Sequence, residues 1–193
     1  MPPGIKSPVR QSRSKWTAVR DRDKQTRFEL MVVPHQAAAY NLARWLMRND
    51  HDAEDVVQES YLRAYRFFEN FHGSDGRAWI LAIVRNSCYT LLQQNRRKPL
   101  AGEEEMTEIP DTQPDPGALH LGKIDRLLLR QALEELPEEF REAIILRELE
   151  GLSYKEIGAI TGAPIGTVMS RLARARQKLE RSMMPQRSQG GAV

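Results

Sequence analysis

The chain has 193 residues, with 29 lysine and arginine residues against 26 aspartate and glutamate residues and a single cysteine. This length suits one medium-sized domain or two small ones, and the hydrophobic content of 40% is too high for a wholly disordered chain. No run approaches the roughly 18 apolar residues that a membrane span needs, and one cysteine excludes an intrachain disulfide. We therefore expect a cytoplasmic protein that does not insert into a membrane.

Charge is distributed unevenly along the chain. Residues 1–27 hold eight basic and two acidic side chains, whereas residues 99–124 hold one basic and six acidic ones. The segment 171–187 carries six basic side chains and one acidic side chain. Such a basic block is either a surface that binds nucleic-acid phosphates or simply a solvated helix face.

Apolar residues follow helical spacing in two parts of the chain, residues 28–98 and 125–184. The remaining segments are rich in proline, glycine or charge, and they predict a flexible basic arm at 1–27, an acidic linker at 99–124 and a disordered tail at 185–193. No strand-like alternation of useful length is present. The sequence predicts an all-α protein with two small helical domains joined by a flexible linker.

Three main helices are expected in the first domain. The helix at 28–47 is expected to bend or restart at Pro34, and Asp50 and Asp52 favour the start of the next helix. The segment 71–76 interrupts that helix before a third one begins. The inner side of the third helix is expected to hold Trp79, Ile80, Ile83, Val84, Ser87 and Leu91.

Four helices are expected in the second domain. Gly151 ends the second of them, and Ser153 with Glu156 forms a capping-box pattern for the third. Gly162 then ends the third helix, and Pro164 opens the fourth. The buried side of the second helix is expected to hold Phe140, Ile144 and Leu149.

The last two helices, joined by a short turn, describe a helix-turn-helix whose second helix is basic. A 4-3-4 spacing predicts that Val168, Leu172, Ala175 and Leu179 are buried. Hydroxyl and guanidinium groups fall on the opposite face, where they suit contacts to phosphates and to base edges in a major groove. The alternative is a surface helix with no nucleic-acid role. The residues assigned to DNA binding here are Pro164, Gly166, Thr167, Ser170, Arg171, Arg174 and Lys178.

The sequence offers little for catalysis or cofactor binding. It contains no phosphate-binding glycine loop, no nucleophile elbow and no zinc-protease motif. The acidic cluster at 50–55 has no further ligands at suitable spacing, so its carboxylates more simply stabilise a helix start. We expect no enzyme activity, no metal, no cofactor and no small-molecule substrate.

Several stretches of the chain resemble the sigma-70 family of transcription initiation factors. The segments 52–65 (DAEDVVQESYLRAY) and 77–86 (RAWILAIVRN) are similar to region 2 of that family. Leu136-Pro137 and the segments 151–157 (GLSYKEI) and 166–176 (GTVMSRLARAR) are similar to region 4. Because nothing large lies between these regions, the chain resembles the extracytoplasmic-function (ECF) class.

This resemblance implies a specificity subunit that binds core RNA polymerase and promoter DNA. Region 4 is implied to read the −35 element through the helix at 164–181. The loop at 71–76 and the helix after it are implied to read and open the −10 element, with Trp79 assigned to the core. The positions matched to the −10 element are Phe71, His72, Ser74, Asp75, Arg77, Arg85, Asn86, Arg96 and Arg97. Those matched to the clamp helices of the largest polymerase subunit are Asp52, Asp55, Gln58, Glu59 and Arg63.

The resemblance also implies an anti-sigma factor as a partner, because small sigma factors of this class are commonly sequestered by one. A stand-alone helix-turn-helix repressor or activator is the alternative function, and a protein-interaction adaptor is a third. The block at 28–98 favours the sigma factor, since a simple repressor has no need for an acidic and polar helix face beside a polar-aromatic loop. Two positions depart from the family pattern. Thr90 stands where an acidic residue is frequent, and Gly158 where alanine is more frequent.

Overall fold

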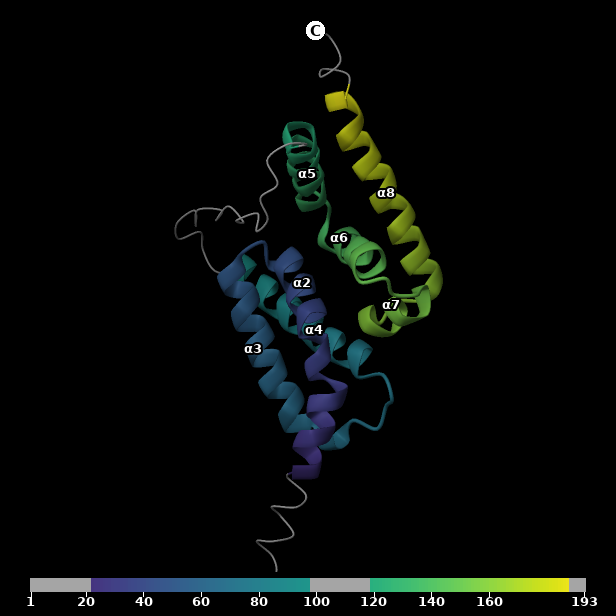
Figure 1. Cartoon of the computed structure of the whole chain (residues 1–193). Coiled ribbons are helices and arrows are strands. Elements are labelled where there is room, and N and C mark those ends of the chain that lie inside the picture. The colour runs from purple at the N-terminus through teal and green to yellow at the C-terminus, as the bar shows by residue number, and fades with distance from the viewer. Residues whose placement is uncertain (1–21, 98–118, 188–193) are drawn as a thin grey trace, which may run out of the picture.

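The computed structural model of the chain describes residues 22–97 and 119–187 (Figure 1). Most of the expected arm at 1–27, of the linker at 99–124 and of the tail at 185–193 lies outside these ranges. The described residues of these segments, 22–27, 119–124 and 185–187, are helical, so the predicted boundaries of all three segments were wrong by a few residues. Every regular element of the described residues is a helix, which confirms the all-α prediction. None of these helices combines the length and hydropathy that a bilayer crossing requires.

The N-terminal domain is built from a helix at 22–31 and three longer helices that contact one another pairwise. Its elements after the first helix are η1 (Val33–His35), α2 (Gln36–Met47), α3 (Asp50–Phe67), η2 (Phe68–Asn70) and α4 (Gly76–Arg97). The chain restarts at Pro34, as predicted, because proline occupies the first turn of η1 and cannot continue the preceding helix.

A polar cap starts α3. The side chain of Asn49 accepts a hydrogen bond from the backbone N–H of Asp52 at 3.1 Å. Asp50 and Asp52 lie in the first turn, where carboxylates are stabilised by the positive end of the helix dipole. The helix start is therefore at the predicted place, but Asn49 rather than an aspartate provides the cap.

Aromatic rings join the first helix of this domain to α4. Phe28 meets Tyr65 and Phe68 edge to face, with ring centroids 5.2 Å apart in both pairs. Phe71 stacks on Trp79 with centroids 4.5 Å apart. Trp79 is partly buried against the apolar core, which confirms its assignment to the core.

Gly76, the first residue of α4, packs directly on the end of the helix at 22–31. A Cβ atom at this position would overlap the backbone carbonyl of Met31. We expect Gly76→Ala to lower the free energy of unfolding by about 1–3 kcal/mol, because one segment must shift to accept the methyl group. Urea unfolding measures the change. Gly166→Ala is the control, since its Cβ would have no neighbour within 4 Å; equal stability of the two variants would contradict the expected overlap.

The C-terminal domain contains α5 (Leu119–Glu134), α6 (Glu138–Ile144), η3 (Ile145–Leu149), α7 (Tyr154–Thr161) and α8 (Ile165–Arg187). Gly151 and Gly162 have φ values of +67° and +68° and follow the ends of η3 and α7, as predicted. The placement of Leu149 on the buried side was wrong, because its side chain is 56% exposed. The segment η3 is a π-helix, and its extra residue per turn rotates Leu149 away from the position that α-helical spacing predicts.

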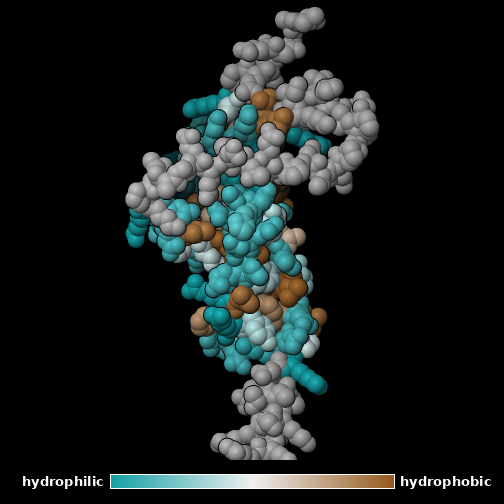
Figure 2. Space-filling model, turned by 90° about the vertical axis from the view of Figure 1, so that its left-hand side faces the viewer, coloured by the Kyte–Doolittle hydropathy of each residue, from teal (hydrophilic) through white to brown (hydrophobic). Residues whose placement is uncertain are grey.

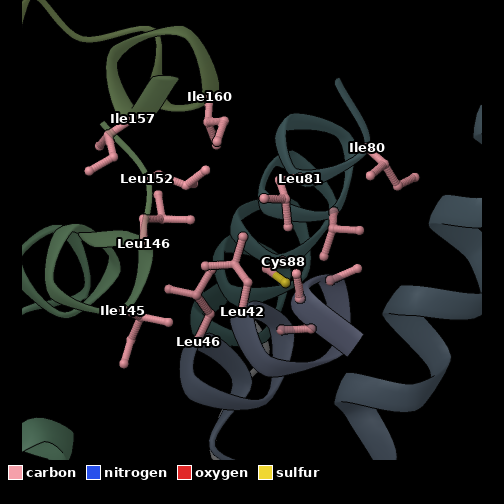
Figure 3. Packing of buried hydrophobic residues seen from close by; sticks show 14 of the residues in the cluster. Leu42, Leu46, Ile80, Leu81, Cys88, Ile145, Leu146, Leu152, Ile157 and Ile160 are labelled. Atoms are coloured by element: carbon pink, nitrogen blue, oxygen red, sulfur yellow. The ribbon is translucent and has the colours of Figure 1, made fainter. Parts of the chain in front are cut away.

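The two domains pack against each other. One apolar cluster contains residues of both, and α4 contacts α7 while α2 contacts α6 and η3. In Figure 3, Leu146 and Leu152 of the C-terminal domain lie beside the helices that carry Leu42 and Leu81. By contrast, the outer face on the side of α3 is mainly hydrophilic, with scattered apolar residues (Figure 2). The sequence predicted the two domains but not this contact between them.

Candidate functional site

The predicted helix-turn-helix is formed by α7, a short turn and α8. The hydroxyl of Ser153 accepts from the N–H of Glu156 at 3.3 Å, and the carboxylate of Glu156 accepts from the N–H of Ser153 at 2.7 Å. This capping box confirms the predicted start of α7. The turn is tight: a Cβ on Gly158 would lie 3.0 Å from the carbonyl oxygen of Ala163, which explains the glycine at this position.

The faces of α8 divide as the spacing predicted, except that Leu179 is only half-buried. Val168, Leu172 and Ala175 are at most 1% exposed and attach the helix to the domain. The residues assigned to DNA binding lie on the accessible side: Pro164, Gly166, Ser170, Arg174 and Lys178 are exposed, and Thr167 and Arg171 are half-buried. The hydroxyl of Ser170 donates to the carbonyl of Thr167 at 2.9 Å.

Carboxylates of the same domain pair with two arginines of α8. Arg171 lies 2.9 Å from Glu139, and its side chain is 20% exposed. Arg176 lies 2.7 Å from Glu148. No carboxylate in the described ranges forms an ion pair with Arg174. Arg174 therefore presents its guanidinium to solvent from the middle of the helix.

The positions matched to the polymerase share one helix, α3. Asp55, Gln58, Glu59 and Arg63 are exposed and Asp52 is half-buried. Beside this face lies an open groove of about 960 Å³, which the sequence analysis missed. Residues from η1, α2 and α3 line it, among them Val33, Tyr40, Gln58, Tyr61, Leu62 and Tyr65. The available signal was Leu62, an apolar residue off the buried stripe of α3 that is 52% exposed.

The loop before α4 holds the first residues matched to the −10 element. His72 and Ser74 are exposed, whereas Phe71 is half-buried by its stack on Trp79. The carboxylate of Asp75 accepts from the backbone N–H of Ala78 at 2.9 Å and so caps the first turn of α4. The loop thus combines two exposed polar side chains with one aromatic ring held against the core.

The arginines of α4 face the C-terminal domain. Arg77 lies 2.9 Å from Glu150, Arg85 2.5 Å from Glu142, and Arg96 2.5 Å from Glu138. Arg77 also donates to the backbone carbonyl of Glu150 at 2.8 Å. Two further positions matched to the −10 element, Asn86 and Arg97, are exposed on the same helix. Three of the four assigned arginines of α4 therefore form ion pairs between the domains.

Glu142 lies deepest in this interface, at 1% exposure. Burial raises the pKa of its carboxyl above the usual value, while the positive charge of Arg85 and the hydrogen bonds from Arg85 and Tyr89 act in the opposite direction. The hydroxyl of Tyr89 donates to Glu142 at 3.3 Å. Sequence reasoning missed this residue, because a glutamate next to Arg141 on an amphipathic helix gives no sign of burial.

Reactive and metal-binding groups are scarce in the part of the chain that the structure describes. No three His, Cys, Asp or Glu side chains there are grouped to hold a metal ion. Cys88 is fully buried, and burial raises the pKa of its thiol to about 12. The thiol is therefore protonated at neutral pH and shielded from solvent.

These features define a two-domain, all-helical protein of the helix-turn-helix class, with a basic helix in one domain and an acidic and polar helix face in the other. Residues 31–98 match the family model for sigma-70 region 2. Residues 126–179 match the model for sigma-70 region 4.

Comparison with curated proteins places the chain in a narrower group of this family. The ECF RNA polymerase sigma-E factor of Salmonella typhimurium is 35% identical over 170 residues, which cover 83% of this chain and 88% of that protein. The ECF RNA polymerase sigma factor SigE of Mycolicibacterium smegmatis is 37% identical over 150 residues, which cover 77% of this chain and 58% of that protein. The chain belongs to the sigma-70 family as an ECF RNA polymerase sigma factor, and it functions in transcription initiation. A stand-alone repressor or activator is not favoured.

Solved structures agree in fold. The sigma factor RpoE of Bartonella quintana, in complex with the anti-sigma factor NepR, is similar with a TM-score of 0.65 and 27% identity, over 81% of this chain and 96% of that one. CnrH in complex with the cytosolic domain of CnrY has a TM-score of 0.58 and 24% identity, over 85% and 92% of the two chains.

Proposed function

We propose that this chain is a non-enzymatic subunit that binds core RNA polymerase in the cytoplasm and directs it to promoters with −10 and −35 elements. The observation that carries the proposal is the combination of two surfaces in one chain: the acidic and polar face of α3 and the basic outer face of α8. A DNA-binding regulator needs only the second surface. A factor that brings a polymerase to DNA needs both.

The polymerase is proposed to bind α3. Asp55, Glu59 and Arg63 follow one another at intervals of four, so they lie along one side of the helix. The neighbouring groove adds apolar area through Leu62 and Val33, which are 52% and 40% exposed. A charged strip beside an apolar groove suits a helical partner, here the clamp helices, because the charges orient the contact and the groove buries apolar side chains.

The loop at 71–76 and α4 are proposed to bind the −10 element. His72 and Ser74 offer hydrogen-bonding groups at the surface, and an unstacked base needs such groups beside an aromatic ring. Arg85, Arg96 and Arg97 of α4 are proposed to contact the DNA backbone, where such contacts weaken as salt concentration rises. Arg77 and Asn86 of the same helix are proposed to bind the −10 element with them. Asp75 contributes by capping α4.

The −35 element is proposed to bind the N-terminal half of α8. In a helix-turn-helix the first turns of the second helix enter the major groove. The exposed Ser170, Arg174 and Lys178 lie on that part of α8 or directly after it. An arginine there is able to make a bidentate contact to guanine, and a lysine is able to neutralise a phosphate.

An anti-sigma factor is proposed as the regulatory partner. The support is the structure of the sigma factor RpoE from Bartonella quintana, which was solved in complex with an anti-sigma factor. The similarity to RpoE covers 81% of this chain. A protein that covers α3 or α8 would block the polymerase or the promoter, so either surface is sufficient for sequestration.

Run-off transcription with purified core polymerase tests the proposed function. Core enzyme plus this chain is expected to give discrete transcripts from a subset of a genomic fragment library, and core enzyme alone is expected to give none. Selected fragments are expected to share two short motifs at a fixed spacing. Transcripts that do not depend on the chain would refute the proposal, and DNA binding without any effect on the polymerase would favour a simple regulator.

Glu59→Lys tests the polymerase face separately. Reversal of this exposed charge is expected to weaken binding to core polymerase by at least about 1 kcal/mol, or about fivefold in Kd, because a complementary charge becomes a repulsive one. Competition for core polymerase against a labelled wild-type chain measures the change. Glu29→Lys makes the same charge reversal on an exposed residue of the helix at 22–31. Equal affinity of both variants would remove Glu59 from the interface.

A further inference from the structure

The groove beside α3 gathers apolar and aromatic side chains at the surface of the N-terminal domain. Leu62 is 52% exposed and Val33 is 40% exposed, and the rings of Tyr61 and Tyr65 line the same groove. Apolar side chains gathered in a hollow mark a surface that binds a partner. The clamp helices are proposed above to fill this groove when polymerase binds. In the free chain these side chains face water unless a segment of the chain itself covers them.

Charge adds a second feature to the groove. Glu54 lines it, is exposed, and forms no ion pair with a residue in the ranges 22–97 and 119–187. Asp50, which accepts a hydrogen bond from the lining residue Tyr40 at 3.4 Å, is by contrast paired with Arg44. An occupant that fits the groove is therefore apolar where it meets the tyrosines and basic where it meets Glu54.

Residues 1–21, which we call the N-terminal segment, have this composition and lie outside the described ranges. The segment holds five basic side chains and one acidic side chain, Asp21. Trp16 is its single aromatic residue, and Lys15 and Arg13 precede it closely. A tryptophan ring buries a large apolar area on aromatic neighbours, and the basic residues before it supply the charge that Glu54 lacks.

The first described helix brings the N-terminal segment to the groove. Phe28, on the helix at 22–31, lines the groove itself. The Nζ atom of Lys24 lies 4.6 Å from the centroid of the Tyr65 ring, which lines the groove as well. Figure 1 shows this helix, in purple, at the end of the domain where α3 finishes. The segment thus joins the domain less than two helical turns before a residue of the groove.

The length of the segment is sufficient for docking. Phe28 lies about 9 Å along its helix from Arg22 at 1.5 Å per residue. Trp16 precedes Arg22 by six residues, which span about 20 Å when extended, and Arg13 precedes it by nine, which span about 30 Å. Trp16 therefore reaches past Phe28 into the groove. The eleven residues of α3 from Tyr65 back to Glu54 cover about 16 Å, so Arg13 reaches the end that holds Glu54.

We propose that the groove beside α3 binds the N-terminal segment of the same chain, with Trp16 against the tyrosines and the preceding basic residues at Glu54, and that core polymerase displaces this segment. The displacement rests on the proposed binding of polymerase to α3, whereas the docking does not. A covalently attached segment is present at high effective concentration, so a weak contact fills the groove. Apparent affinity for polymerase then equals intrinsic affinity multiplied by the fraction of chains with an open groove.

Cysteine cross-linking in the full chain tests the docking. Thr17→Cys/Gln58→Cys places one thiol beside Trp16 and the other in the groove, of which Gln58 is an exposed lining residue. The control is Thr17→Cys/Arg66→Cys, since Arg66 is exposed on α3 outside the lining residues. Cys88 is fully buried and does not compete. Mild oxidation is expected to give at least about fivefold more intrachain disulfide in the groove variant than in the control, and added Trp16→Ala is expected to remove this excess.

Affinity for core polymerase tests the displacement. Trp16→Ala, and separately a deletion of residues 2–20, are expected to bind core polymerase about fivefold more tightly than the wild-type chain, because the open fraction rises. Trp16→Phe is the matched control, since it keeps an aromatic ring for the groove and is expected to bind like the wild type. Competition against a labelled wild-type chain measures all three.

The outcomes separate the docking, the displacement and the proposed function. Equal disulfide yields in the groove variant and its control would overturn the docking, as would a disulfide that joins two chains, which would assign the groove to a second copy. Equal or weaker polymerase binding by both Trp16→Ala and the deletion would overturn the displacement. The cross-linking needs no polymerase, so a failure of run-off transcription, which tests the proposed function, would leave its result standing.

Discussion

Replacing Arg141 with methionine is expected to lower the free energy of unfolding by about 3–5 kcal/mol, because a buried network of backbone carbonyls loses a charged donor. The side chain is 1% exposed. It donates to four backbone carbonyls at 2.7–3.0 Å, those of Leu133, Trp45, Glu134 and Leu136. Methionine has a similar length and no donor, so these carbonyls lose a partner inside the protein.

Urea unfolding followed by circular dichroism and by tryptophan fluorescence measures this loss. Arg130→Met is the control, since the side chain of Arg130 is 27% exposed and pairs with Glu134 one turn along α5; an i,i+4 pair on a helix contributes about 0.3–0.5 kcal/mol. Similar losses in the two variants would show that the carbonyls around Arg141 are satisfied in some other way. Because Trp45 belongs to the N-terminal domain, the methionine variant is also expected to weaken the contact between domains.

Arg174→Ala is expected to have the largest effect on recognition of the −35 element, with a loss of about 1–3 kcal/mol, or about 5- to 150-fold in affinity. Arg174 is exposed near the centre of α8, whereas Arg171 and Arg176 are engaged by Glu139 and Glu148. Arg174 forms no ion pair with a carboxylate of the described residues, so its guanidinium does not have to break one when it binds a base edge.

The measurement compares the affinity of the holoenzyme for two DNA fragments. One is a promoter fragment, and the other is the same fragment with a scrambled −35 element. Arg174→Ala is expected to reduce the difference between the two fragments. Arg181→Ala removes an equal charge two turns further along α8, where Arg181 is exposed, and it is expected to weaken both fragments equally. A uniform loss for Arg174→Ala would instead assign Arg174 to the DNA backbone.

Local signals were sufficient for most helix boundaries. Ser153 and Glu156 cap α7, Gly162 ends it, and Pro164 opens α8, all at the predicted positions. These residues act on their immediate neighbours through hydrogen bonds and allowed φ values, so the sequence contains the whole cause. The buried stripe of α8 was predicted for the same reason, because helical periodicity is a local property.

Predictions that assumed regular α-helical geometry were less secure. Leu149 was placed on the buried side of its helix, but the π-helical segment η3 turns it outward. Gly158 departs from the family pattern, in which alanine is more frequent, and the structure shows that the carbonyl of Ala163 leaves little room for a side chain. In both places tertiary packing decides the local geometry, and nothing in the nearby sequence reports that packing.

The sequence by itself determined the all-helical class, the helix-turn-helix and the division of charge along the chain, because caps, turn residues and periodicity act over a few positions. Only the tertiary structure decided which charges meet. Arg77, Arg85 and Arg96 pair with glutamates that lie 73, 57 and 42 positions away. Spacing identifies the face of a helix on which a charge lies, but the partner depends on how separate helices pack. The arginines predicted to hold promoter DNA are for this reason found holding the other domain of their own chain.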